Sequence, residues 1–259
     1  MNDFLKLSIL TLSVMLSAVS LSAAHPKIVA HRGYWDAAGS AQNSLRSLAK
    51  ADSVGSWGSE FDVWRSSDGV LFCNHDRTFK GVTFTDATSK VISAVVLDNG
   101  EPVPTLESML EEAGRHPSLR LVFELKEHAD KTAEEAAVRE SIALVEKMGL
   151  ADRTEYISFS KQAIINFARH APAGTDIYYL TGDLTPAQVK VVGGTGIDYN
   201  INILKAHPEW IAEAHDLGMK VNIWTVDQPE DMKWCIDNGA DIITTNQPVV
   251  LSEVIAGSL

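Results

Sequence analysis

Three carboxylates and a lysine occupy alternate positions within two apolar runs of this 259-residue chain. Glu60 and Asp62 lie two residues apart in one run, and Glu124 and Lys126 repeat the spacing in another. Side chains two residues apart on a β-strand point to the same side of the strand. The spacing therefore predicts that each pair faces one way, and that neighbouring strands would gather three acids and one ammonium group.

A group of three buried carboxylates needs a compensating cation, because burying unpaired charge is costly. Ligands that are all oxygen atoms favour a hard divalent cation, so Glu60, Asp62 and Glu124 predict Ca²⁺ or Mg²⁺ rather than Zn²⁺. The alternative is a metal-free layer of ion pairs, in which Arg32 and Lys126 neutralise the acids.

Two histidines stand at the ends of further apolar runs. His31 is followed by Arg32, and His75 is followed by Asp76. Catalytic groups of barrel enzymes lie at the C-terminal ends of the strands, where these residues would be placed. Two histidines beside the acids favour an active site over a plain layer of ion pairs.

Nine apolar runs alternate with amphipathic segments and predict strands at 27–33, 59–64, 70–74, 119–126, 154–159, 176–182, 196–202, 220–226 and 240–246. The turn at 66–69 is too short for a crossover between parallel strands, so the run that follows it is a hairpin arm. Eight strands remain, which predicts an α/β fold, the (β/α)8 TIM barrel. A doubly wound open sheet is the alternative, but no G-x-G-x-x-G follows the first run.

A single domain is expected over residues 25–259, with an insertion at about 66–104 after the second barrel strand. Residues 79–103 are Thr-rich and irregular, and long loops of this kind usually cover an active site. We therefore expect a small cap over the barrel mouth.

The N-terminal segment has the pattern of a signal peptide. Lys6 precedes an apolar run at 7–21, and Ser22-Ala23-Ala24 follows it. The run is short for a transmembrane anchor, which is the alternative. We expect residues 1–24 to be removed, giving a periplasmic or secreted protein with no stable membrane anchor.

Charge and the remaining polar residues restrict the function further. A net charge of −12 without a Lys/Arg cluster argues against a nucleic-acid partner. The two cysteines, Cys73 and Cys235, are expected to be buried free thiols rather than a disulfide. Six further histidines are expected at the surface: His25, His116, His128, His170, His207 and His215.

The motifs resemble, in order, those of the glycerophosphodiester phosphodiesterase family. The resemblance extends from residue 28 to about 248, nearly the whole expected mature chain. The matching segments are HRG at 31–33, E-x-D at 60–62, DG to HD at 68–76, PTLE at 104–107, E-x-K at 124–126, WTV at 224–226 and GADIITT at 239–245.

The resemblance implies metal-dependent hydrolysis of glycerophosphodiesters to sn-glycerol 3-phosphate and an alcohol. The glycerol 2-hydroxyl would attack phosphorus to give a cyclic phosphate, which water then opens. It also implies roles for eight residues: acid–base catalysis by His31 and His75, substrate contact by Arg32, Lys126 and Trp224, and metal binding by Glu60, Asp62 and Glu124.

Two departures from the family pattern leave other functions open. Gln42 stands where the family commonly has Glu, and Asn246 stands where Asp is frequent. The alternatives are a phospholipase-like phosphodiesterase that acts on intact lipids, and a non-catalytic protein that binds phosphodiesters. The sequence has no obvious amphipathic or aromatic membrane-docking stretch, which argues against the lipid-directed enzyme, and the intact histidine pair and acid trio argue against the non-catalytic protein.

Overall fold

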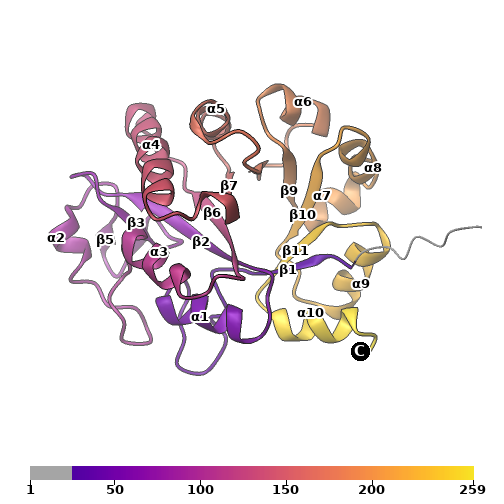
Figure 1. Ribbon diagram of the computed structural model, residues 1–259, viewed down its shortest axis with the longest axis horizontal. Coiled ribbons are helices and arrows are strands. Elements are labelled where there is room, and N and C mark those ends of the chain that lie inside the picture. The colour runs from indigo at the N-terminus through magenta and orange to yellow at the C-terminus, as the bar shows by residue number, and fades with distance from the viewer. Residues whose placement is uncertain (1–24) are drawn as a thin grey trace, which may run out of the picture.

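The computed structural model describes residues 25–259, so the signal peptide predicted for residues 1–24 lies outside the described residues. Parallel strands close a barrel in this range, and helices surround it (Figure 1). The eight barrel strands are β1 (Lys27–Ala30), β2 (Gly58–Arg65), β6 (Arg120–Leu125), β7 (Thr154–Ser158), β8 (Ile177–Tyr179), β9 (Gly196–Asn200), β10 (Lys220–Trp224) and β11 (Ile242–Thr245). Because β1 pairs with both β2 and β11, the ring has no open edge, and the predicted (β/α)8 fold is confirmed.

Helices follow the strands and pack on the outside of the barrel. Several begin where a side chain accepts a hydrogen bond from the first helical turn: Ser44, Asp130, Ser160 and Thr185 are such N-caps. The helices are α1 (Leu45–Ser53), α3 (Leu106–Gly114), α4 (Lys131–Lys147), α5 (Lys161–His170), α6 (Pro186–Val191), α7 (Ile201–Ala206), α8 (Glu209–Asp216), α9 (Pro229–Asp237) and α10 (Pro248–Ile255), with a short 3-10 turn, η1 (Ala151–Arg153).

The segment after β2 forms the predicted hairpin. β3 (Leu71–Cys73) runs antiparallel to β2, and the amide of Ser66 donates to the carbonyl of Val70 at 2.8 Å across the turn. The rest of the insertion contains β4 (Thr78–Phe79), β5 (Val82–Thr83) and α2 (Ser89–Ile92). It has its own apolar cluster, formed by Trp64, Phe72, Phe84, Ile92, Val95, Leu97 and Val103.

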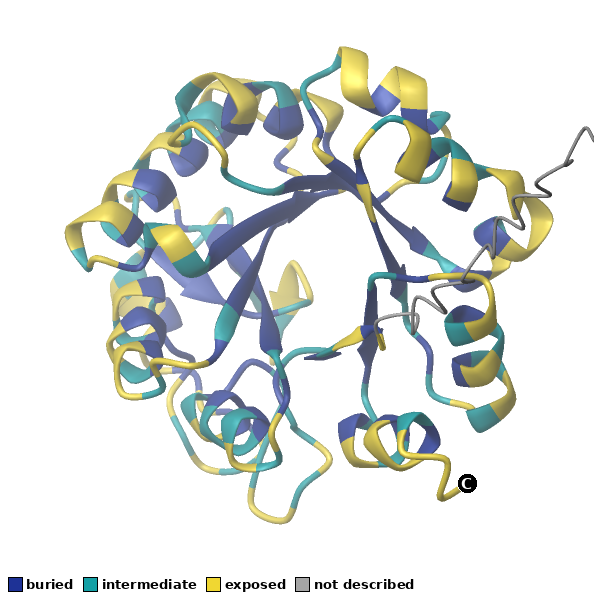
Figure 2. Cartoon of the chain, turned by 45° about the vertical axis from the view of Figure 1, so that its right-hand side comes forward, coloured by how far each residue is buried: buried dark blue, intermediate teal, exposed yellow. Residues whose placement is uncertain are grey.

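Two apolar layers hold the barrel and support the site. The larger lies between strands and helices, whose buried faces turn inward in Figure 2. The smaller lies inside the barrel and consists of Val29, Val122, Ile157, Tyr178, Leu180 and Ile242. Ile157 and Leu180 of this inner cluster also line the cavity that holds the polar residues.

Both cysteines are buried free thiols, as predicted. Burial raises the pKa of the Cys235 thiol to about 12 and also raises the pKa of Cys73, so both favour the inert thiol over the reactive thiolate. Within residues 25–259, no helix has the length and apolarity needed to cross a bilayer.

Candidate active site

Glu60, Asp62 and Glu124 lie together inside the barrel, where β2 and β6 run side by side. Asp62 is paired with Glu124 in the strand register, so their side chains enter the barrel at the same level. One carboxylate oxygen from each of the three residues lies within 4.8 Å of the other two. All three are buried. The structure therefore brings the predicted acids into one cluster.

Two cations adjoin this acid cluster. The Lys126 ammonium lies 2.6 Å from Asp62 Oδ1 and 2.7 Å from Glu124 Oε1. The Arg32 Nε lies 3.7 Å from Asp62 Oδ2, and the Arg32 backbone amide donates to Glu60 Oε2 at 2.6 Å. Three carboxylates thus face two cationic side chains, which leaves one formal negative charge uncompensated.

The loop after β1 needs an unusual backbone to place Arg32. Arg32 and Gly33 have φ values of 57° and 73°, and a Cβ at Gly33 would lie 2.4 Å from the Ser47 hydroxyl oxygen. Asn43, with φ 57°, donates from its side chain to Asp62 Oδ2 at 2.7 Å and accepts from the Asp62 amide at 2.9 Å. The His-Arg-Gly motif and Asn43 therefore fix the cluster from one side.

The ring of His31 is held in place by a chain of hydrogen bonds. Its Nδ1 donates to Asn246 Oδ1 at 2.9 Å, and Trp35 Nε1 donates to the same oxygen at 2.9 Å. Because an amide oxygen only accepts, the ring proton lies on Nδ1 and Nε2 keeps its lone pair. Burial, reinforced by the Arg32 guanidinium, lowers the pKa of His31 to about 4.

Asp227 explains why an amide stands at position 246. The Asn246 side-chain NH₂ donates to Asp227 Oδ2 at 2.7 Å, and the Asn246 backbone amide donates to Asp227 Oδ1 at 2.8 Å. An aspartate at 246 would set two carboxylates against each other at this distance. Asn246 therefore accepts a hydrogen bond from His31 and donates one to Asp227. An aspartate at this position could donate to Asp227 only if it carried a proton.

His75 lies across the cavity from this chain of bonds, at the end of β3. Its Nδ1 donates to Asp76 Oδ1 at 2.8 Å, so its Nε2 is also free for chemistry. Burial lowers the pKa of His75 below the ordinary histidine value. Asp62 opposes this shift, and an anionic substrate would favour the protonated ring in the same way.

The three acids have very different proton affinities. Burial raises the pKa of Glu60 well above its ordinary range, with Asp62 and Glu124 adding to the effect. Burial also raises the pKa of Glu124 to about 7. At Asp62 burial acts in the same direction, but Lys126, His75 and Arg32 outweigh it and hold the pKa well below its usual range. An added cation would favour the ionised form of all three.

The acid cluster fits a hard divalent cation. Its donors are all carboxylate oxygens, which suit Ca²⁺ or Mg²⁺ and not the nitrogen- and sulfur-rich sites of zinc. Glu60 Oε1 is buried and makes no hydrogen bond to any of the described residues. A buried carboxylate oxygen without a partner is costly, and a bound cation would supply one.

A cavity of about 180 Å³ opens above the cluster; we call it the inner cavity. Seven of the eight predicted site residues line it, and Asp62 lies behind them, fully buried. The Trp224 and Phe159 rings meet edge to face, with centroids 5.5 Å apart. The full lining is His31, Arg32, Glu60, His75, Glu124, Lys126, Ile157, Phe159, Leu180, Asp198, Trp224, Thr225 and Thr244.

A second cavity, of about 390 Å³, lies on the other side of His75; we call it the outer cavity. The loop after β1 contributes Trp35 and Gln42, and the insertion contributes Phe79 and Leu97. The insertion thus forms a wall at the barrel mouth. Gln42 accepts a hydrogen bond from Arg32 Nη1 at 2.7 Å and lies outside the three-acid group, so it orients Arg32 rather than adding a fourth acid.

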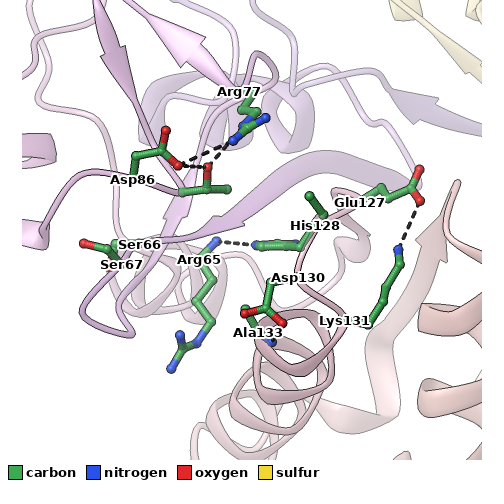
Figure 3. Close-up of a pocket in the computed structure, with 12 residues that line it drawn as sticks. Arg65, Ser66, Ser67, Arg77, Asp86, Glu127, His128, Asp130, Lys131 and Ala133 are labelled. Carbon is green, nitrogen blue, oxygen red and sulfur yellow. Dashed lines mark hydrogen bonds and ion pairs between the residues drawn. The ribbon is translucent and has the colours of Figure 1, made fainter.

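The prediction that His128 lies at the surface is wrong. This residue is only 3 % exposed. It borders a cavity of about 780 Å³ between the insertion and the start of α4 (Figure 3). Its Nδ1 donates to the Lys126 carbonyl at 2.8 Å, and its Nε2 accepts from the Arg65 amide at 3.1 Å. The ring joins the ends of β2 and β6 and has no free nitrogen. Of the other five, His116 and His170 are half-buried, whereas His25, His207 and His215 are exposed as expected.

Several residues of the site were not identified from the sequence as site residues. Asn43, Asp227 and Asn246 act through hydrogen bonds to residues distant in the chain, and Asp198 lines the inner cavity. Asp198 did carry a signal, because it is an acid inside a predicted strand. Burial, followed by Glu124 and Glu155, raises the pKa of this carboxyl well above its ordinary value.

The fold and the site together define a barrel enzyme whose polar groups gather at the C-terminal ends of the strands. Residues 31–250 match the glycerophosphoryl diester phosphodiesterase family. The chain belongs to that family.

Similar proteins cover nearly the whole chain. A solved glycerophosphodiester phosphodiesterase from Parabacteroides distasonis is 42% identical and covers 90% of this chain and 98% of its own, with a TM-score of 0.88. A glycerophosphodiester phosphodiesterase from Caldanaerobacter subterraneus is 26% identical, covering 88% of this chain and 97% of its own. A phosphodiesterase from Oleispira antarctica, solved with the product sn-glycerol-3-phosphate, is 20% identical and shares the fold with a TM-score of 0.79 over 90% of this chain and 97% of its own.

Proposed function

We propose that this protein hydrolyses soluble glycerophosphodiesters to sn-glycerol 3-phosphate and an alcohol. The observation that carries the proposal is the meeting of both histidines, both cations and the acid cluster around one inner cavity. The family assignment and the product named for the Oleispira antarctica structure support the same substrate class.

His31 acts as the base in the first step. Its Nε2 is unprotonated and its ring is fixed by Asn246, so it can accept the proton of the glycerol 2-hydroxyl as that oxygen attacks phosphorus. The attack forms a cyclic phosphate and expels the alcohol. Water then opens the ring, and His31 returns the proton to the glycerol oxygen.

His75 acts as the acid in the first step. It lines both cavities, so an alcohol that leaves toward the outer cavity passes beside its Nε2. The proton goes to the leaving oxygen, and His75 then takes a proton from the water that opens the cyclic phosphate. Arg32 and Lys126 bind the non-bridging oxygens of the phosphate through both steps.

Glu60, Asp62 and Glu124 hold Ca²⁺ or Mg²⁺ in this proposal. A bound dication supplies positive charge to offset the negative charge that develops on the phosphate oxygens. The ammonium of Lys126 lies against the same carboxylates. Lys126 therefore keeps the acids together and faces the phosphate.

The test is a coupled assay for sn-glycerol 3-phosphate with glycerophosphocholine as substrate. We expect turnover that a chelator abolishes and that added Ca²⁺ or Mg²⁺ restores. Formation of phosphocholine and glycerol would contradict the proposed bond cleavage. Faster turnover of phosphatidylcholine vesicles than of glycerophosphocholine would favour the lipid-directed alternative. Turnover that a chelator does not change would contradict the role of the metal.

A further inference from the structure

Asp198 is a buried carboxyl that the proposed reaction does not use. It lies on β9 and is 1 % exposed, yet it lines the inner cavity. Its Oδ1 is buried and has no hydrogen-bond partner among residues 25–259. A buried carboxyl oxygen without a partner is costly, so this atom is expected to have one when the cavity is filled.

The surroundings of Asp198 fix it in place. Trp224 Nε1 donates to the Asp198 carbonyl at 2.9 Å, and Asn222 lies opposite Asp198 in the register of β10 and β9. Asn222 in turn accepts from the Thr244 hydroxyl at 3.1 Å. The Tyr178 ring fills the space beside Gly196, two residues earlier on β9, where a Cβ would come within 2.2 Å of it. The strand segment that carries Asp198 is therefore held in place in the cavity wall.

The inner cavity is lined by chemically different side chains. Arg32 and Lys126 are cationic, which suits a phosphate. Ile157, Leu180 and Trp224 are apolar, and Trp224 contacts Asp198 through the hydrogen bond from its Nε1 to the Asp198 carbonyl. Asp198 has no ion pair with a lysine or arginine of the described chain. A carboxyl in such surroundings suits an uncharged hydroxyl, from which it can accept a hydrogen bond in either protonation state.

We propose that Asp198 determines specificity by binding the C1 hydroxyl of the glycerol moiety. The inference rests on the proposed function. With the phosphate on C3 and the attacking hydroxyl on C2, the C1 hydroxyl is the one polar group of the glycerol left without a role. A cavity of about 180 Å³ has room for this three-carbon unit and not for long acyl chains. An acylated C1 oxygen also has no hydrogen to donate, so the same carboxyl selects deacylated substrates.

The experiment compares two substrates in two proteins. Glycerophosphocholine is set against 2-hydroxypropyl phosphocholine, which keeps the attacking hydroxyl and lacks only the C1 hydroxyl. In the wild-type protein we expect kcat/KM to be about 30-fold lower for the second substrate, as for one lost hydrogen bond to a buried carboxyl. Asp198→Ala should lower kcat/KM for glycerophosphocholine by a similar factor and change the value for the deoxy substrate by less than about 3-fold. Asp198→Asn, which keeps an acceptor oxygen, should retain most of the discrimination.

Glu155 provides the matched control. It is also a buried acid of the barrel interior, but it pairs with Arg120 at 3.1 Å and does not line the inner cavity. Glu155→Gln should lower the melting temperature and leave the ratio of the two kcat/KM values unchanged. Equal losses on both substrates in Asp198→Ala, or a wild-type protein that does not discriminate, would overturn the role of Asp198. Absence of sn-glycerol 3-phosphate from either substrate would instead contradict the proposed function.

If Asp198→Ala does not fold, a third substrate decides. Lysophosphatidylcholine, acylated at C1, should be turned over at least about 30-fold more slowly than glycerophosphocholine by the wild-type protein. Comparable rates for these two substrates would overturn the proposal without any variant.

Discussion

Two groups of charged residues adjoin the end of β6, and they differ in how their charges are compensated. In the acid cluster, three buried carboxylates face two cations, and Glu60 Oε1 has no hydrogen-bond partner within the described chain. In the cavity of Figure 3 the lining has three cationic and three acidic side chains: Arg77 lies 3.4 Å from Asp86, and Lys131 lies 3.1 Å from Glu127. That cavity is more than four times larger, at about 780 Å³ against 180 Å³. Unbalanced buried charge, and not size, therefore identifies the candidate site.

The largest difference between the two regions is expected in how much kcat falls when their histidines are replaced. His31→Ala and His75→Ala are each expected to lower kcat by about 10²-fold or more, because each removes a proton-transfer group. His128→Gln removes a ring whose nitrogens are both already bonded to backbone groups. It should lower the melting temperature and leave kcat within a few-fold. Steady-state kinetics on the three folded variants measure these effects. Normal turnover by His31→Ala or His75→Ala would show that the replaced histidine has no catalytic role.

Lys126 offers a sharper comparison, because it contacts the acids and faces the phosphate. We expect Lys126→Met to lower kcat/KM by about 10²-fold through loss of a charge-assisted contact to the phosphate. The same change should tighten binding of Ca²⁺ or Mg²⁺, because it removes a cation that lies against Asp62 and Glu124. Calorimetric titration measures the second effect. Unchanged or weaker cation binding by the variant would contradict a competition between Lys126 and the metal for these ligands.

The Asn246 and Asp227 pair predicts a shift in pH dependence. The double variant Asn246→Asp with Asp227→Asn reverses the bond between them and places a carboxylate on His31. A carboxylate stabilises the imidazolium, so the pKa of His31 rises from about 4 by one to two units. His31 must be neutral to act as a base, so the acid limb of the kcat/KM profile should move to higher pH by the same amount.

The single variant is the control for this reversal. Asn246→Asp alone sets its carboxylate against Asp227 where an amide now donates at 2.7 Å. It should melt at a lower temperature than both the wild-type protein and the double variant. An acid limb at the same pH in the wild-type and double-variant proteins would show that His31 is not the group whose protonation limits the rate.

The smallest effects are expected in the cavity of Figure 3. Arg77→Gln and Lys131→Gln break exposed ion pairs, which are worth about 0 to 1 kcal/mol. Their kcat/KM values on glycerophosphocholine should stay within about two-fold of the wild-type value. A loss comparable to that of Lys126→Met would mean that this cavity takes part in substrate binding.

The features that follow from strand geometry could be predicted from the sequence. Alternation along a strand places Glu60 with Asp62, and Glu124 with Lys126, before any tertiary contact is known. The short turn after β2 identifies the hairpin arm, and the count of the remaining runs gives the closed barrel.

The remaining features depend on how the barrel closes. Asn246 reaches His31 because β11 pairs with β1 in the register that sets Thr245 opposite Ala30. Nothing local to either residue indicates this pairing. His128 was misplaced because a histidine after a strand usually lies in an exposed loop, whereas here its ring satisfies backbone groups at the ends of two strands. Hydrogen bonds between segments that are distant in the chain leave no local pattern, so they could not be predicted from this one sequence.

Calorimetric titration of Ca²⁺ and Mg²⁺ into chelator-treated protein tests most directly whether the unbalanced acid cluster is the functional centre. We expect one ion per chain for the wild-type protein and for Asp86→Asn, which alters the balanced cavity, and no detectable binding for Glu60→Gln. Absence of binding by the wild-type protein, or unchanged binding by Glu60→Gln, would contradict the assignment of this cluster as a metal centre.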